Sequence, residues 1–145
     1  MGDLSTDLTS RFKNNKVKAL INILYTSNWI TSLQNEFFKP FGISPQQYNI
    51  LRILNGANQA LKVQTIKDRM IDRAPNATRL MDKLCAKGLI VRIACPADRR
   101  VVHIEITKAG KKLLKAIAVD FDEDLLKNLT ETEAKQLSDL LDKIR

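Results

Sequence analysis

Residues 77–92 read ATRLMDKLCAKGLIVR, and residues 97–114 read ADRRVVHIEITKAGKKLL. The first stretch carries apolar side chains at helical spacing as far as Gly88, and then a short aliphatic run that favours a strand. In the second stretch, apolar and polar side chains alternate over residues 101–106 before a helical pattern returns. Because a turn with proline and aspartate separates the two β-prone runs, we expect a helix, a β-hairpin and another helix.

The first of these helices is predicted over residues 75–87, opened by Pro75 and closed by Gly88. Its buried face is expected to consist of four apolar residues, Ala77, Leu80, Met81 and Leu84. Another face presents polar residues at i, i+3 and i+7, namely Asn76, Arg79 and Lys83. A short helix is predicted just before it, over residues 62–70. Residues 43–106 are therefore expected to fold as a winged helix-turn-helix.

Longer helical segments flank this unit. Residues 8–38 lack proline and glycine, and predict a helix of about 30 residues, about 45 Å long, that Asn14 and Asn15 interrupt near its start. Pro40 and Gly42 are expected to end this helix. A helix of that length exceeds what one small domain can bury, so part of its apolar stripe needs a second chain. The unit of residues 43–106 itself opens with a helix that begins with a capping box, Ser44-Pro45-Gln46-Gln47, and ends near Gly56.

Two more helices are predicted after the hairpin. Thr107 caps the first, which runs on through Leu113, Leu114, Ile117, Phe121 and Leu125. A second capping box, Thr130-Glu131-Thr132-Glu133, starts the last helix. The apolar stripe of that helix consists of Leu137, Leu140, Leu141 and Ile144. The fold class expected is mostly α-helical with a small β-hairpin.

Positive charge is concentrated in the middle of the chain. The 145 residues carry 24 Lys and Arg against 16 Asp and Glu, a net charge of +8. Residues 61–112 hold thirteen basic and five acidic residues, whereas residues 113–145 are net negative. Such a surplus indicates a polyanionic partner, either nucleic acid or an acidic membrane face. No apolar run approaches the roughly 20 residues of a membrane span, and the N-terminus lacks the pattern of a signal peptide.

The aromatic residues lie elsewhere. Seven of them precede residue 49, and the basic segment contains none. Proteins that grip single strands stack bases on aromatic rings, and membrane-surface helices mix aromatic and aliphatic residues with lysine. The pattern therefore favours the phosphates of a duplex. One histidine, two cysteines and no Gly-rich phosphate loop predict no metal site, no cofactor and no enzymatic activity.

The second helix of a helix-turn-helix reaches base edges through its N-terminal half, in a major groove about 12 Å wide. Asn76, Thr78 and Arg79 lie in that half. Asparagine pairs with adenine and arginine with guanine. Arg79 and Lys83 suit phosphates equally well, and Asn76 suits a helix cap or solvent, so base and phosphate contact stay open.

Arg99 and Arg100 are expected at the hairpin tip, where a guanidinium enters the minor groove favourably. Asp98 either holds a neighbouring arginine extended through a charge-assisted pair or simply forms the turn.

Residues 43–141 resemble the MarR family of bacterial transcriptional regulators. The resemblance is carried by residues 43–54 (ISPQQYNILRIL), 130–144 (TETEAKQLSDLLDKI) and the two stretches quoted first. It implies a homodimer in which residues 1–42 and 107–145 form a helical dimerisation region, while the winged unit binds double-stranded DNA. Arg79 matches a position of the family's recognition helix, and Asp98 and Arg100 match its wing Asp-x-Arg.

The resemblance also implies a ligand pocket between the dimer helices and the winged unit. Candidates to line it around a small aromatic effector are Trp29, Phe37, Phe38, Phe41 and Tyr48. Aromatic residues at helical spacing also form plain core, and that alternative stays open. The family's peroxide-sensing branch uses a cysteine in the first helix region, and residues 1–40 contain none.

Thiol sensing would then fall to Cys85 or Cys95. Cys85 lies on a largely apolar helix face and is expected to pack in the core. Cys95 is expected to be exposed near Arg92 and Arg99, which would lower the pKa of its thiol.

The function predicted is a cytoplasmic bacterial regulator, dimeric and most simply a repressor, that binds specific duplex DNA and responds to a small molecule or signal. The alternative is a winged-helix protein-interaction module without operator binding, which would associate with DNA weakly and without salt dependence.

Overall fold

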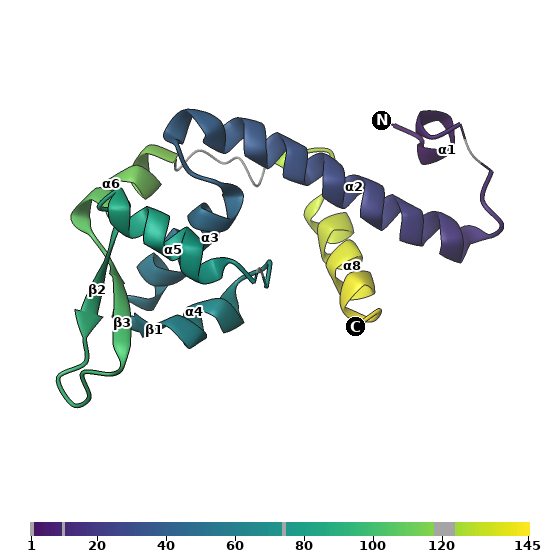
Figure 1. Ribbon diagram of the computed structural model, residues 1–145. Coiled ribbons are helices and arrows are strands. Elements are labelled where there is room, and N and C mark those ends of the chain that lie inside the picture. The colour runs from purple at the N-terminus through teal and green to yellow at the C-terminus, as the bar shows by residue number, and fades with distance from the viewer. Residues whose placement is uncertain (1, 10, 74, 118–123) are drawn as a thin grey trace.

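The computed structural model describes residues 2–9, 11–73, 75–117 and 124–145. Figure 1 shows a winged unit at one end of the long helix α2, which extends away from it, with α8 also standing apart from that unit. The fold is mostly α-helical with a small antiparallel sheet, as predicted. The elements follow in the order α1 (Leu4–Asp7), α2 (Asn15–Phe38), η1 (Lys39–Phe41), α3 (Pro45–Ala57), β1 (Leu61–Lys62), α4 (Val63–Arg69), α5 (Ala77–Ala86), β2 (Ile90–Ala94), β3 (Val102–Ile106), α6 (Lys108–Ile117) and α8 (Glu131–Asp142).

The long helix α2 has 24 residues rather than about 30, because Asn14 caps it. The Asn14 side chain accepts a hydrogen bond from the Val17 backbone N–H at 3.0 Å, which is the usual bond of an N-cap. A separate turn of helix, α1, lies before it. At the other end α2 gives way to the 3₁₀ turn η1 at Pro40, and Gly42 with φ +68° ends the helical path.

Both predicted capping boxes are confirmed. The Gln47 N–H donates to Ser44 Oγ at 3.2 Å, and the Ser44 N–H donates to the Gln47 side chain at 3.0 Å. At the start of α8, Thr130 and Glu133 make the same reciprocal pair, at 3.3 and 2.8 Å. Each box satisfies two backbone N–H groups that a helix start leaves without an internal partner.

The sheet has three strands in the order β1-β3-β2, with β3 in the centre. The hairpin of β2 and β3 was predicted, whereas β1 was not, since Lys62 was assigned to the following helix. β1 pairs antiparallel with β3, with Leu61 opposite Ile104. Both side chains are buried, so this pairing closes the core beneath the wing. A strand of two residues has no period that sequence alone can reveal.

One core joins α3, α4, α5, the sheet and α6. Its fully buried members include Ile50, Leu51, Ile66, Leu84, Ile104 and Ile117. Gly110 lets α6 approach the sheet, because a Cβ there would lie 2.3 Å from the Leu89 carbonyl oxygen. The predicted cap of α6 is confirmed, since Thr107 Oγ1 accepts the Gly110 N–H at 3.1 Å. The described part of α6 ends at Ile117, and Phe121 lies outside the described residues.

Apolar side chains remain exposed on the two helices that stand apart from this core. On α2 they are Val17, Leu20, Ile23, Leu24, Tyr25 and Trp29, and at the C-terminal end of the chain they are Leu137, Leu140 and Ile144. Leu24 is 55% exposed and Leu140 is 62% exposed. Within the described ranges, no helix is both long and apolar enough to cross a bilayer.

Candidate nucleic-acid interface

Helix α5 turns its apolar side inward and its polar side to solvent. Ala77, Met81 and Leu84 are buried, so Thr78, Arg79 and Lys83 are exposed on the remaining surface. The helix begins at Ala77 and not at Pro75, because Pro75 and Asn76 form a turn before it. Asn76 is the exposed N-cap residue, yet its side chain makes no capping hydrogen bond. The amide of Asn76 is therefore available to a partner.

Three contacts from α3 hold α5 and the turn before it. The Gln47 side chain, only 5% exposed, donates to the Leu80 carbonyl oxygen at 3.4 Å. The Ile71 N–H donates to the Asn49 side chain at 3.0 Å. Gln46 reaches Asp72 at 3.5 Å. The sequence predicted Gln46 and Gln47 only as part of a capping box and gave Asn49 no role, because contacts to a distant segment leave no local pattern.

The wing places two arginines at its tip. Figure 1 shows the hairpin of β2 and β3 projecting beyond the rest of the winged unit. Arg99 and Arg100 are exposed, and among the described residues no carboxylate pairs with either guanidinium. Their charge is therefore open to an anionic partner.

Asp98 acts differently from the charge-assisted pair considered above. Its carboxylate accepts the backbone N–H of Arg100 at 2.9 Å, and its carbonyl oxygen accepts the Val101 N–H at 3.0 Å. Across the hairpin, the Cys95 N–H donates to the Val101 carbonyl oxygen at 3.0 Å. Asp98 thus closes the turn, because its oxygen satisfies a main-chain donor rather than an arginine side chain.

An ion pair joins the wing to α5. Arg92 on β2 and Asp82 on α5 form a salt bridge, with each side chain about half exposed. Asp82 is the one acidic residue of α5, so the pair with Arg92 neutralises the negative charge beside Arg79 and Lys83. The sequence did not predict this pair, although a single aspartate among the basic residues of a helix suggests that it has a basic partner.

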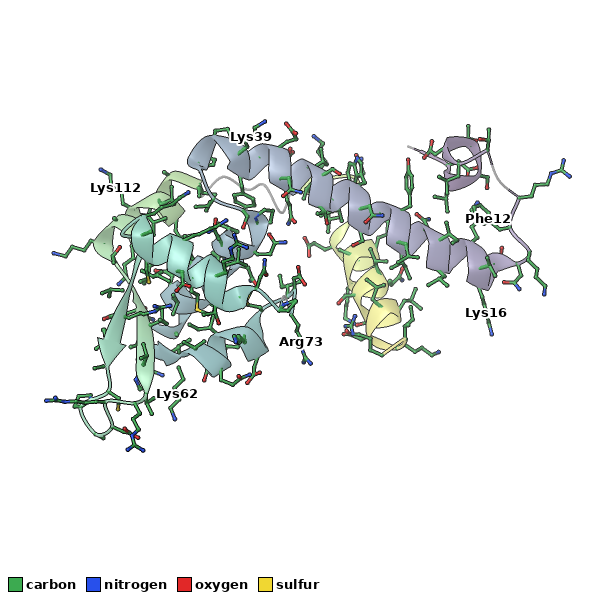
Figure 2. The ribbon with its side chains drawn as sticks, in the orientation of Figure 1. Phe12, Lys16, Lys39, Lys62, Arg73 and Lys112 are labelled. Atoms are coloured by element: carbon green, nitrogen blue, oxygen red, sulfur yellow. The ribbon has the colours of Figure 1, made fainter. Side chains whose placement is uncertain are left out.

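A second group of basic side chains lies beside the start of α5. A cleft of about 320 Å³ between α4 and the turn before α5 is lined by Lys67 and Arg73, together with Gln64, Asp68 and Met70. Figure 2 shows Arg73 at the end of the winged unit opposite the wing. Basic side chains therefore flank α5 on both sides.

The candidate ligand-pocket residues divide into two groups. Phe38 and Tyr48 lie 4.5 Å apart between ring centroids, and Phe37 contacts Phe38 and Phe41 at 5.1 and 5.8 Å. Phe38 is 2% exposed, so this cluster is part of the core, and an effector there stays a prediction. Trp29 is not part of the cluster and is 48% exposed on α2.

The two cysteines differ in surroundings. Cys85 is half-buried and packs against the core. Cys95 is also half-buried, not exposed as expected. The backbone N–H groups of Asp98 and then Ala97 hold the pKa of its thiol below the usual value, with a smaller contribution from Lys62. The expected causes, Arg92 and Arg99, are therefore wrong. Among the described residues, no cluster of His, Cys, Asp and Glu could hold a metal ion.

Comparison with known proteins gives one consistent picture. The MarR family model matches residues 43–102. The transcriptional regulator MhqR of Bacillus subtilis is 30% identical over 137 residues, which cover 91% of each chain. The multiple antibiotic resistance protein MarR of Escherichia coli is 30% identical over 116 residues, covering 77% of this chain and 80% of that protein.

Solved structures of MarR proteins are also similar to this chain. A MarR transcription factor from Planctomyces limnophilus is 34% identical with a TM-score of 0.69, covering 91% of this chain and 98% of that one. A cysteine-to-serine mutant of MarR from Escherichia coli, complexed with operator DNA, is 26% identical with a TM-score of 0.73 and covers 99% of both chains.

Proposed function

This chain belongs to the MarR family, and we propose that it is a dimeric transcriptional repressor that binds an operator in duplex DNA through α5 and the wing. It would act in the bacterial cytoplasm, where such DNA is found, and the proposal assigns no reaction to it. The observation that carries the proposal is the exposed basic surface of α5 and the wing tip. Within the described chain, no carboxylate pairs with Arg79, Lys83, Arg99 or Arg100.

The roles of individual residues follow from their positions. Asn76, Thr78 and Arg79 lie in the N-terminal half of α5, the half that reaches base edges in a helix-turn-helix. Arg99 and Arg100 extend from the wing toward a narrow minor groove, where negative potential favours a guanidinium. Asp98 supports them by fixing the turn.

The dimer is supported by the exposed apolar side chains of α2 and α8. A second copy of this chain would cover them, so that residues 1–42 and 107–145 form the dimerisation region and residues 43–106 the DNA-binding unit. Two winged units would then bind half-sites that lie one helical turn of DNA, about 10 base pairs, or a multiple of it apart. The response to a small aromatic molecule rests on the half-buried rings of Phe41 and Tyr48.

The decisive experiment selects bound sequences from random duplex DNA with the purified protein, and repeats the selection with candidate ligands. We expect enrichment of a pseudo-palindrome with two half-sites, and a smaller yield with an effector. Weak retention of all sequences without salt dependence would favour the protein-interaction module instead, because phosphate contacts make DNA binding fall with salt.

A further inference from the structure

A groove lies at the corner where α2 ends and α3 begins, against the C-terminal half of α5. Its volume is about 590 Å³, it is open to solvent, and we call it the corner groove. Lys39 from η1 lines it together with Lys83 from α5 and Lys87, the residue that follows α5, and Gly42 and Ser44 line it on the side of α3. Figure 2 shows Lys39 at the end of α2 that adjoins the winged unit.

The charge of the corner groove has a single sign. Three lysines line it and no acidic side chain does. Among the described residues, none of the three ammonium groups makes an ion pair. Lys87 donates a hydrogen bond to the Gly42 carbonyl oxygen, which fixes its ammonium at the rim and leaves two of its three donors for another partner. The groove is therefore suited to an anion.

The corner groove continues the face of α5 that the proposed function assigns to DNA. With 100° between successive residues, Asn76, Arg79, Lys83 and Lys87 fall within an arc of about 80°. Arg79 and Lys87 are eight residues apart, which is about 12 Å along the helix. The major groove is about 12 Å wide. With α5 directed across the groove and its start among the bases, its end would therefore lie near a phosphate strand that borders the groove.

We propose that the corner groove binds a backbone phosphate of the duplex, held by Lys39 and Lys87 with Lys83 beside them. The proposal rests on the proposed function and extends the interface beyond α5 and the wing to the end of α2. The contact carries no sequence information, so it positions the protein on DNA and contributes to affinity on every duplex. It also places Lys39, the residue that follows the long helix α2, in contact with DNA.

The test measures binding by fluorescence anisotropy from 50 to 200 mM NaCl, on the selected operator and on an unrelated duplex of equal length. The variants are Lys39→Gln and Lys87→Gln. Lys16→Gln is the matched control, since Lys16 is an exposed lysine at the opposite end of α2 (Figure 2). Lys39→Arg restores a cation, and circular dichroism melts check that each variant folds.

We expect Lys39→Gln to weaken binding to both duplexes by the same factor and to reduce the salt slope by about 0.9 for each lost phosphate, about 1.8 for a dimer. The wild type then loses on the order of tenfold more affinity than the variant between 50 and 200 mM salt. Lys87→Gln behaves alike, Lys39→Arg recovers the slope, and Lys16→Gln leaves it unchanged.

Several results would overturn the assignment. Unchanged slopes for Lys39→Gln and Lys87→Gln in a protein that binds its operator would refute this inference alone, whereas a wild type that binds no duplex would refute the proposed function. Weakening on the operator but not on the unrelated duplex would mean sequence reading instead of phosphate contact. Calorimetric binding of inorganic pyrophosphate that Lys39→Gln abolishes, with DNA binding unchanged, would make the groove a site for a free anion.

Discussion

The Thr107 hydroxyl donates a hydrogen bond to the Gly88 carbonyl oxygen at 2.7 Å. The same oxygen of Thr107 accepts the Gly110 N–H and so caps α6. Gly88, with φ +69°, is the residue at which the chain leaves α5 for β2. One side chain therefore ties the end of the proposed DNA-reading helix to the start of α6.

Replacing Thr107 with valine keeps its shape and removes both hydrogen bonds. We expect Thr107→Val to lower the free energy of unfolding by about 1–2 kcal/mol, as the loss of an N-cap does. Urea titration followed by circular dichroism measures this. The control Thr132→Val, at an exposed position on α8, should change stability by less than about 0.5 kcal/mol. Equal effects of the two substitutions would contradict the role given to Thr107.

Gly110 tests the close approach of α6 to the sheet. An alanine Cβ would lie 2.3 Å from the Leu89 carbonyl oxygen and 2.7 Å from a side-chain carbon of Ile106. We expect Gly110→Ala to destabilise the protein by about 3 kcal/mol, because both neighbours must shift. Gly56 on α3 has no heavy atom within 4 Å of the added carbon, so Gly56→Ala should stabilise the protein by about 0.5–1 kcal/mol. Thermal unfolding compares the two alanines.

Arg79 and Arg100 should differ in what their loss does to DNA binding. Arg79→Ala is expected to relax base preference at one position of each half-site and to cost about 1–3 kcal/mol on the preferred operator. Arg100→Ala should weaken operator binding markedly, because the wing then loses a guanidinium from the minor groove. Titration of a panel of operator variants separates the two. Unchanged affinity of Arg100→Ala at moderate salt would refute the wing assignment.

The oligomeric state should respond to the exposed face of α2. Leu24→Glu adds a charge where a second copy is proposed to pack, so we expect the protein to sediment as a monomer at micromolar concentration while the wild type sediments as a dimer. Ile71 is 90% exposed in the turn between α4 and α5, and Ile71→Glu should leave the dimer intact. A monomeric wild type would rule out the two-half-site arrangement.

The capping box of α8 predicts a pH effect on stability. The backbone N–H of Thr130 and then its hydroxyl hold the pKa of Glu133 below the ordinary 4.5. A carboxylate whose pKa is lower in the folded state adds stability that is fully present above its unfolded pKa and is lost as pH falls through the folded value. The stability advantage of wild type over Glu133→Gln should therefore shrink below about pH 4.5. Urea unfolding from pH 7 to 3 measures it, with Glu131→Gln as the control in the same helical turn.

Local signals in the sequence predicted most of the fold. Ser44 and Thr130 revealed two helix starts, because a capping box is complete within four residues. Gly88 marked the end of α5, and the alternation of residues 101–106 revealed β3. In contrast, β1 depends on Leu61 meeting Ile104, which is a distant pairing that leaves no local pattern. The short helix α1 was missed because four residues are too few for a period.

In the candidate site, too, features set by local spacing could be predicted and features set by distant contacts could not. Helical spacing in the sequence predicted that Arg79 and Lys83 share one exposed face of a helix. Spacing could not decide whether Asp98 would bond an arginine side chain or a backbone N–H, because the path of the loop decides that choice. That Lys39 and Lys87 line the same groove could likewise not be predicted from the sequence, since it depends on how the end of α2 packs near the end of α5.

The turn at the wing tip is closed by the Asp98 carboxylate and by main-chain groups, whereas the side chains of Arg99 and Arg100 take no part in it. Substitution at these two positions should therefore leave the hairpin folded. A loss of DNA binding after either substitution would therefore reflect the lost guanidinium and not a loss of folded protein. The wing tip is accordingly a place where the strength of DNA binding can be altered while the scaffold stays the same.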